Sequence, residues 1–171
     1  MQGITPKDYV DQLLELQNLD FDHFAVGGLA FRKKTEIDAI LSAISDIFHA
    51  ENYQVHLLGC GKLDLIKKYA FITSFDCVSP LADSYRDSQG KVTYLYKLDR
   101  NRLIKTRLMD LRNQDFHNTC DCPCCKLVGD QIIWAGENNR NRARSFHNAY
   151  IFNEYIAKKF LKKQEKSLLN F

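Results

Sequence analysis

The sequence predicts an α/β protein built from parallel strand–helix units, and three observations support this class. Short apolar strands run into glycine-rich turns, first at 22–30 and again at 54–61. Each turn is followed by a helical pattern, at 35–48 and at 62–69. The units recur at intervals of roughly 20 to 30 residues, which is typical of parallel βα repeats. Because such folds carry their sites at the carboxyl ends of the strands, we expect a site on one rim.

The two longest early helices are predicted from their first turns. Thr5 is a favourable N-cap, Pro6 suits the first helical position, and Asp8 follows the cap by three residues. Apolar residues then recur at helical spacing to about residue 18. Thr35 with Asp38 repeats the cap-and-carboxylate pattern and opens a second amphipathic helix.

The remainder of the chain is less regular. A third strand is expected at 74–78, and Val92–Tyr96 alternates like a strand, whereas the region from there to Thr119 is expected to be irregular. A last helix is predicted from about Ala143 to Lys163. The side chains that we expect it to turn inward are Phe146, Tyr150, Ile151, Tyr155 and Phe160.

Length and composition allow one substantial core. The chain has 171 residues, of which 45% are hydrophobic, and its net charge of +3 does not by itself indicate a nucleic-acid binder. We find no signal peptide and no apolar stretch of membrane-spanning length. Cysteines without an export signal favour a reducing, cytoplasmic compartment. Basic residues outnumber acidic ones from Arg140 onward.

Four cysteines within six residues predict a metal site. The preferred ligands are Cys120, Cys122, Cys125 and His147, a mixture of thiolates and imidazole that is typical of tetrahedral structural Zn²⁺, and Cys124 is left over. Neighbouring thiols this close cannot bridge one another without strain. An iron–sulfur cluster and free buried thiols are the alternatives. Because a closed four-ligand site leaves no position for a substrate, the metal is expected to stabilise the fold.

Five motifs, in this order, resemble the second half of the tRNA-guanine transglycosylases. They are Gly27-Gly28-Leu29-Ala30, His56-Leu57-Leu58-Gly59-Cys60-Gly61, Phe75-Asp76-Cys77-Val78-Ser79-Pro80, the Cys-x-Cys-x-x-Cys cluster and His147-Asn148. Gln2-Gly3 is similar to the Gln-Gly pair that ends the fifth barrel strand of that family. Each motif alone is common, but their order and spacing cover nearly the whole chain.

The resemblance implies part of a (β/α)8 barrel with a C-terminal zinc-binding subdomain. Residues 1–82 would form the last four βα units, residues 83–147 a loop-rich zinc-binding insertion, and residues 148–171 the C-terminal helix. A complete barrel usually needs about 250 residues. We therefore expect either a fragment or a chain that pairs with an N-terminal-half partner chain or a second copy of itself. The implied strand ends are Gly3, Leu29, Gly59 and Val78.

The family replaces guanine in a nucleic acid by a 7-deazaguanine base of the queuosine or archaeosine type. The resemblance implies that Asp76 is the nucleophile, which attacks the sugar carbon as guanine leaves and forms a covalent glycosyl intermediate. Without the resemblance, an aspartate after phenylalanine would indicate a turn or a helix cap. The implied base-binding residues are Gln2, Gly27, Gly28, Leu58 and Gly59.

Two departures from the family bear on activity and substrate. The second acid of the family, in a Phe-Asp-Glu motif on an earlier strand, has no counterpart, so the chain alone is not expected to turn over. After the nucleophile, the run Pro80–Asp87 stands where the tRNA enzymes carry Pro-Thr-Arg. Its form, Asp-x-x-Ser-Pro-Leu followed by an aromatic residue, a basic residue and Asp, is closer to the DNA-modifying branch. DNA or tRNA would be bound by Arg86, Arg140, Arg142 and Arg144. The alternative is a non-catalytic, zinc-stabilised nucleic-acid-binding or dimerisation module.

Overall fold

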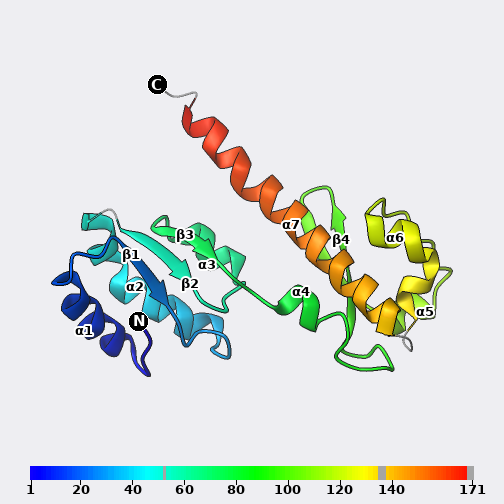
Figure 1. Cartoon of the computed structure of the whole chain (residues 1–171), viewed down its shortest axis with the longest axis horizontal. Helices are drawn as coiled ribbons and strands as arrows, with labels where there is room; N and C mark the ends of the chain where they lie inside the picture. Colours follow the sequence, from blue (N-terminus) through cyan, green and yellow to red (C-terminus); the bar gives the residue numbers. More distant parts are fainter. Residues whose placement is uncertain (52, 135–137, 169–171) are drawn as a thin grey trace. The chain divides into compact units, whose positions relative to one another are not determined.

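The computed structural model describes residues 1–51, 53–134 and 138–168 (Figure 1). The chain folds as two compact units, Met1–Val78 and Ser79–Phe171, here called unit 1 and unit 2. Unit 1 contains α1 (Pro6–Gln17), β1 (His23–Val26), α2 (Lys34–Glu51), β2 (Gln54–Leu57), α3 (Leu63–Lys68) and β3 (Ile72–Phe75). Unit 2 contains α4 (Ser79–Ala82), β4 (Tyr94–Asp99), β5 (Arg102–Arg107), α5 (Leu108–Arg112), α6 (Pro123–Val128), the 3₁₀ helix η1 (Gly129–Ile133) and α7 (Asn138–Leu168).

Unit 1 confirms the α/β class. Its three strands are parallel and lie in the order β1-β2-β3, with α2 connecting the first pair and α3 the second. Met1 extends the edge next to β1, because its amino group donates to Ala25 O at 2.6 Å and its carbonyl accepts from Gly27 N at 2.7 Å. β3 begins at Ile72, two residues before the expected start.

The two faces of this sheet have different surroundings. Along β1 and β2 the apolar side chains Phe24, Val26, Val55 and Leu57 are buried, whereas the alternate positions are exposed or half-buried. The buried face packs against α2, whose Phe48 ring lies 5.6 Å from that of Phe24. The other face is left open by the described residues of unit 1.

The first turn of α1 is the local structure that the sequence predicts. Thr5 accepts from the Asp8 amide and the Asp8 carboxylate reaches back to Thr5 N at 2.8 Å, so a complete capping box forms. The expected start of α2 is wrong by two residues. Lys33 N donates to Glu36 Oε2 at 2.7 Å, and Asp38 instead accepts from Lys68 Nζ at 2.7 Å.

Unit 2 contains a β4–β5 antiparallel hairpin that the sequence only half predicts. β4 was expected, but β5 and α5 lie where the sequence predicts irregular structure. Asp83 is 5% exposed beside this hairpin and accepts hydrogen bonds from Tyr96 Oη at 2.6 Å and from Lys105 Nζ at 2.9 Å. The sequence of β5 is largely polar, and the strand is stabilised by its pairing with β4 and by the Asp83–Lys105 bond.

The inward face of α7 differs from the predicted one. Phe146 and Tyr150 are 66% and 45% exposed, so their expected inward orientation is wrong, whereas Ile151 is buried as expected. The Phe160 side chain lies outside the described residues. The inward positions are instead taken by Ala143, Arg144, His147 and Asn148. The two units meet after Val78, and helix α7 runs continuously past residue 147. The predicted domain boundaries at residues 82 and 147 stay predictions.

None of the helices in the described part of the chain has the length and apolar character needed to cross a membrane.

Candidate functional site

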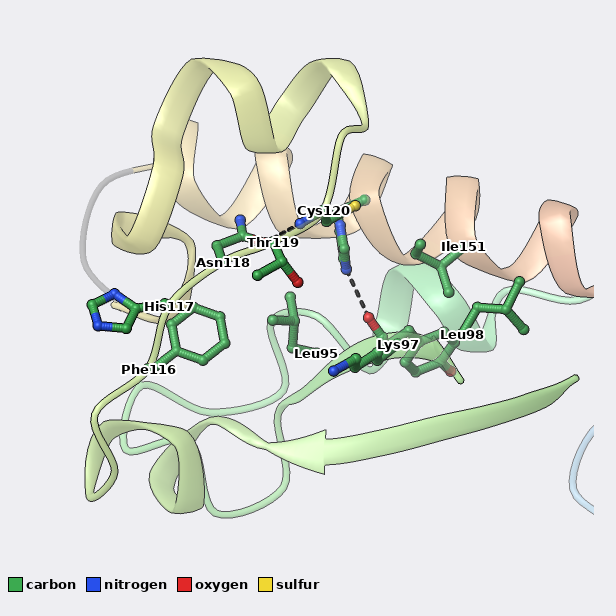
Figure 2. A pocket seen from close by; sticks show the side chains of 11 residues that line it. Leu95, Lys97, Leu98, Phe116, His117, Asn118, Thr119, Cys120 and Ile151 are labelled. Carbon is green, nitrogen blue, oxygen red and sulfur yellow. Dashed lines mark hydrogen bonds between the residues drawn. The ribbon is translucent and has the colours of Figure 1, made fainter. Parts of the chain in front are cut away.

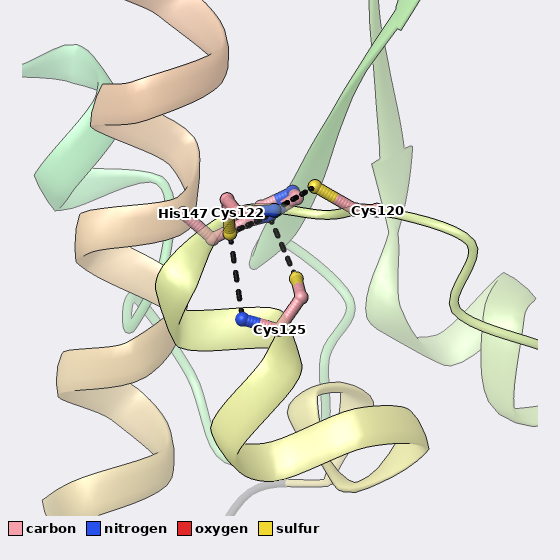
Figure 3. A group of neighbouring side chains, drawn as sticks. All are labelled: Cys120, Cys122, Cys125 and His147. Atoms are coloured by element: carbon pink, nitrogen blue, oxygen red, sulfur yellow. Dashed lines mark hydrogen bonds between the residues drawn. The ribbon is translucent and has the colours of Figure 1, made fainter.

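The cysteine cluster is positioned by the first turn of α6. Cys122 is the N-cap of this helix, Pro123 occupies its first turn, and the Cys125 amide donates to Cys122 Sγ at 3.4 Å (Figure 3). Cys122 N in turn donates to Cys120 Sγ at 3.5 Å. Backbone N–H groups that point at sulfur favour the thiolate form, which is the form that binds metal.

His147 reaches the same point from α7. Its Nε2 donates to Tyr96 O at 2.8 Å, which leaves Nδ1 as the nitrogen with a free lone pair. That Nδ1 lies 3.1 Å from Cys125 Sγ and 3.5 Å from Cys122 Sγ. The backbone carbonyl of β4 therefore sets the tautomer in which His147 can act as a ligand.

The four groups fit a metal ion. One ligand atom from each of Cys120, Cys122, Cys125 and His147 lies within 4.8 Å of the others. Tetrahedral bonds of about 2.3 Å from Zn²⁺ to sulfur place the sulfur atoms at about 3.8 Å, so little movement is needed. Cys124 is not in the group and packs instead against the apolar cluster that contains Leu95 and Ile132. The cluster can hold a metal ion, and its donor set suits zinc.

Burial acts on the protonation of these ligands. It raises the pKa of the Cys125 thiol above its ordinary value and lowers the pKa of His147. Both shifts disfavour charge in the metal-free cluster. A divalent cation reverses the balance for the thiols, because its positive charge stabilises the thiolates.

A hollow of about 200 Å³ lies beside the cluster. Apolar groups from β4, from the segment before the cysteines and from α7 line it, with Cys120 and His147 among the lining residues (Figure 2). Those apolar groups include Leu95, Phe116 and Ile151. The hollow offers an entry path to the two ligands that border it.

The second group of candidate residues lies in unit 1, at the carboxyl ends of its strands. Asp76 directly follows β3, and its Oδ1 accepts from Gly59 N at 3.0 Å and lies 3.2 Å from His56 Nε2. The Gly59 N–H and then His56 hold the pKa of Asp76 below its ordinary value. The side chain is 53% exposed. Asp76 is therefore an accessible carboxylate that is ionised at neutral pH.

The predicted base-binding residues converge on the same rim. A Cβ at Gly27 would lie 3.4 Å from Leu58 Cδ1 and 3.9 Å from Gln2 Oε1, so these three residues are neighbours. Gly28 has φ +72° and faces the Tyr9 hydroxyl, which donates to Gly27 O at 2.8 Å. Gly27 is thus buried and Gly28 exposed at the strand end, and the Tyr9 hydroxyl ties the pair to α1.

The predicted arginines do not form one surface. Arg144 is 1% exposed and its guanidinium donates to the carbonyls of Ser84, Ile132 and Trp134, so the prediction that it binds phosphate is wrong. Arg86 pairs with Asp83 at 2.8 Å.

The other two arginines of the set lie on α7. Arg142 is exposed and Arg140 is half-buried.

Two residues near the sites were quoted in motifs but received no role from the sequence. His56 faces Asp76 from β2, and strand alternation could have found it, because it points to the face opposite Val55 and Leu57. Asn148 is fully buried, accepts from Tyr96 N at 2.9 Å and donates to Tyr94 O at 3.0 Å. It therefore ties α7 to β4 next to His147.

No model of a known protein family matches the chain. Curated proteins do match it over most of its length. The chain is 29% identical over 167 residues to a queuine tRNA-ribosyltransferase of Histophilus somni (strain 129Pt), which covers 92% of this chain and 42% of that protein. It is 29% identical over 150 residues to the protein of that name from Rickettsia rickettsii (strain Sheila Smith), covering 84% and 40%.

A third relative extends the match. The queuine tRNA-ribosyltransferase of Rickettsia akari (strain Hartford) is 27% identical over 165 residues, covering 92% of this chain and 44% of that protein. The chain spans less than half the length of the curated relatives it matches.

Proposed function

Because this chain is a homologue of the tRNA-guanine transglycosylases, we propose that it supplies the nucleophile to a base-exchange site. Guanine in a nucleic acid would leave and a 7-deazaguanine would take its place. The observation that carries the proposal is the position of Asp76. Its carboxylate is ionised, half-exposed and held by Gly59 N–H on the rim that also carries Gly27 and Leu58.

The proposed reaction has two displacements at the anomeric carbon of the sugar. An Asp76 oxygen forms a bond to that carbon while the bond to the guanine nitrogen breaks, and the departing guanine takes a proton from an acid. The incoming base then attacks the same carbon, gives up a proton and releases the Asp76 carboxylate. Two inversions give overall retention. The lowered pKa of Asp76 supports both steps, because it keeps the carboxylate ionised for the first displacement and makes it a good leaving group in the second.

The rim residues would bind the base. Gln2 would donate its side-chain amide to the base carbonyl, and the small Gly27 and Gly28 would let the base approach the backbone. Leu58 would form an apolar wall, since it is 47% exposed beside Gly27. Gly59 would contribute both to the base-binding rim and to the nucleophile, because its amide donates to Asp76 Oδ1.

The metal centre would serve the fold of unit 2. Zinc bound by Cys120, Cys122, Cys125 and His147 would supply a four-way cross-link between the segment at α6 and helix α7.

We further propose that unit 1 is part of a (β/α)8 barrel. The sequential parallel order β1-β2-β3 is the order of barrel strands, and Met1 pairs beside β1 as a fourth. The open face of the sheet would line the barrel interior. An N-terminal-half partner chain or a second copy would close it and bring the acid that protonates guanine.

The relatives carry tRNA in their names, and this favours tRNA as the polymer. The run after Asp76 favours the DNA-modifying branch instead, because its arginines are reduced to Arg86. Parallel assays with tRNA and with duplex DNA decide between the two.

The test is reconstituted base exchange. The chain is mixed with the N-terminal half of the Histophilus somni relative, radiolabelled guanine and tRNA or DNA, and incorporation into the polymer is measured. Asp76→Asn should lower incorporation by about 10⁴-fold or more. Asp64→Asn is the matched control, since Asp64 is an exposed carboxylate of unit 1 that pairs with Lys34 at 2.8 Å. Exchange that survives Asp76→Asn contradicts the nucleophile assignment.

The second candidate function is a non-catalytic, zinc-stabilised nucleic-acid-binding or dimerisation module. The observation that favours it is the Cys-His cluster of unit 2, whose four ligand groups suit a closed structural metal site with no position for a substrate. It predicts polymer binding or self-association with no exchange in any mixture, even when the metal is bound and the wild-type Asp76 is present.

A further inference from the structure

The tip of the β4–β5 hairpin and helix α7 together form a positively charged hollow. Its volume is about 320 Å³, and three of its five lining side chains are cationic. The lining residues are Asp99, Arg100, Asn101, Arg102 and Lys159. The lining carries a net excess of two positive charges, all five lining residues belong to unit 2, and none of them is a predicted zinc ligand.

The turn residue Arg100 is strained. Its φ of +51° is left-handed, a conformation that hairpin turns normally give to glycine or asparagine because a Cβ is unfavourable there. Asparagine tolerates this conformation better than arginine does, and Asn101 is next in the chain, but Arg100 is the residue that adopts it. A strained residue that turn formation does not require points to a role for its side chain.

The cations of the tip differ from those further along the hairpin. Lys105 pairs with Asp83 at 2.9 Å and Arg107 with Asp110 at 2.9 Å, so both have carboxylate partners. Among the described residues, no ion pair is found for Arg100 or Arg102. Their charge is therefore available to an external anion.

The positions of these side chains follow from the strand register. Asp99 pairs with Arg102 and Lys97 with Ile104, so Lys97 and Arg102 project from the same face of the hairpin. Lys97 is exposed. The basic groups thus run along the hairpin end from Lys97 to the tip and on to Lys159, which suits an extended anion better than a single small one.

We propose that this basic tip, made of Lys97, Arg100, Arg102 and Lys159, binds the phosphodiester backbone of RNA. Arginine forks match phosphate oxygens, and the described lining has no large apolar side chain for a lipid or an apolar peptide. The choice of RNA rests on the proposed function, in which the names of the relatives favour tRNA, and the charge, strain and register that define the site do not. This site replaces Arg144 as a source of phosphate contacts.

The first test measures binding of bulk tRNA by the zinc-loaded chain at 50 to 200 mM KCl. Arg102→Gln and Lys159→Gln should each lower the slope of log affinity against log salt by about one, and each should weaken binding about tenfold at the lowest salt. Lys126→Gln removes the same charge from an exposed position on α6 and serves as the control. Equal slopes for all three variants overturn the proposal.

The second test uses the strained turn. Arg100→Gly should raise Tm, because glycine accepts the left-handed backbone, and should at the same time weaken tRNA binding. A purely structural arginine would move stability alone, so unchanged binding overturns the proposal. Inorganic phosphate at matched ionic strength should compete no better than chloride. Strong competition by phosphate would instead indicate a site for a small anion and would also overturn it.

These outcomes are separable from those of the base-exchange proposal. All binding measurements use the zinc-loaded chain without free base or an exchange partner, so their outcome does not depend on base exchange at Asp76. If exchange survives Asp76→Asn while the tip variants still weaken binding, the nucleophile assignment fails and the RNA site stands.

Discussion

Unit 1 and unit 2 are stabilised in different ways. In unit 1 the buried side chains whose burial the structure describes are apolar or aromatic, and their polar groups are the hydroxyls of Tyr9 and Tyr69 and the Cys60 thiol. In unit 2 the buried set includes Asp83, Ser84, Thr93, Arg144, His147 and Asn148. Apolar burial is non-directional, whereas each of these polar groups requires a partner at a defined distance. Unit 2 therefore depends on specific bonds to a degree that unit 1 does not.

The difference follows from the elements that each unit contains. Unit 1 has an 18-residue helix α2 that places a long apolar face on a sheet. The helices of unit 2 before α7 have at most six residues, so they bury little surface each. Small apolar clusters need staples such as metals or buried hydrogen bonds. The Cys-His cluster and Arg144 are such staples.

Metal removal should have the largest effect and should be confined to unit 2. Chelation or Cys125→Ser should lower the free energy of unfolding of unit 2 by up to about 10 kcal/mol. Trp134 is the single tryptophan of the chain and lies in unit 2, so its fluorescence reports this unfolding. Metal should also be lost as pH falls, because protons compete for the thiolates and for His147.

The control for this prediction is Cys124→Ser. Cys124 lies outside the ligand group, so metal content measured by mass spectrometry and the Trp134 signal should change little. A similar loss for Cys124→Ser would mean that the ligand set is wrong. Hydrogen exchange of β1 and β2 amides should be unaffected by either variant.

Arg144→Met should have the next largest effect. The change leaves the carbonyls of Ser84, Ile132 and Trp134 without their donor in a buried place, which should cost about 3 kcal/mol in urea unfolding of unit 2. Arg142→Met is the control, because Arg142 is exposed on the same helix and should change stability by no more than about 0.5 kcal/mol. Equal effects of the two changes would show that the buried hydrogen bonds of Arg144 do not contribute to the stability of unit 2.

Tyr9→Phe should have the smallest effect and should appear in unit 1. It deletes the hydroxyl that donates to Gly27 O and should cost about 1 kcal/mol, measured by urea unfolding with circular dichroism. Tyr150→Phe, at an exposed position of α7, should be silent. A cost near that of Arg144→Met would show that unit 1 also depends on directional bonds.

Local signals in the sequence predicted much of the structure. The Thr5 capping box and the cysteine spacing depend on neighbours within a few residues, and both are found in the structure as predicted. His147 was placed with the cysteines because three thiolates and one imidazole suit tetrahedral zinc, and the four groups lie together in the structure. The start of α2 was wrong because Thr35 competes with Lys33, whose amide bonds to Glu36.

Long-range contacts explain what the sequence did not predict. β5 is polar along most of its length, and its pairing with β4 and the Asp83–Lys105 bond decide its structure. The rotation of α7 was predicted from its aromatic residues, but backbone acceptors and the metal ligands draw Arg144 and His147 inward and leave Phe146 outside. Hydrophobic periodicity cannot detect a buried face that is polar.

The open face of the sheet in unit 1 also affects the tendency of the protein to aggregate in solution. Ala25, His56 and Ser74 present short or polar groups there, so this surface is wettable and gives neighbouring molecules little to adhere to. Small and polar groups of this kind do not form the apolar patch that drives association. We therefore expect that this face of the sheet does not drive aggregation of unit 1 during purification.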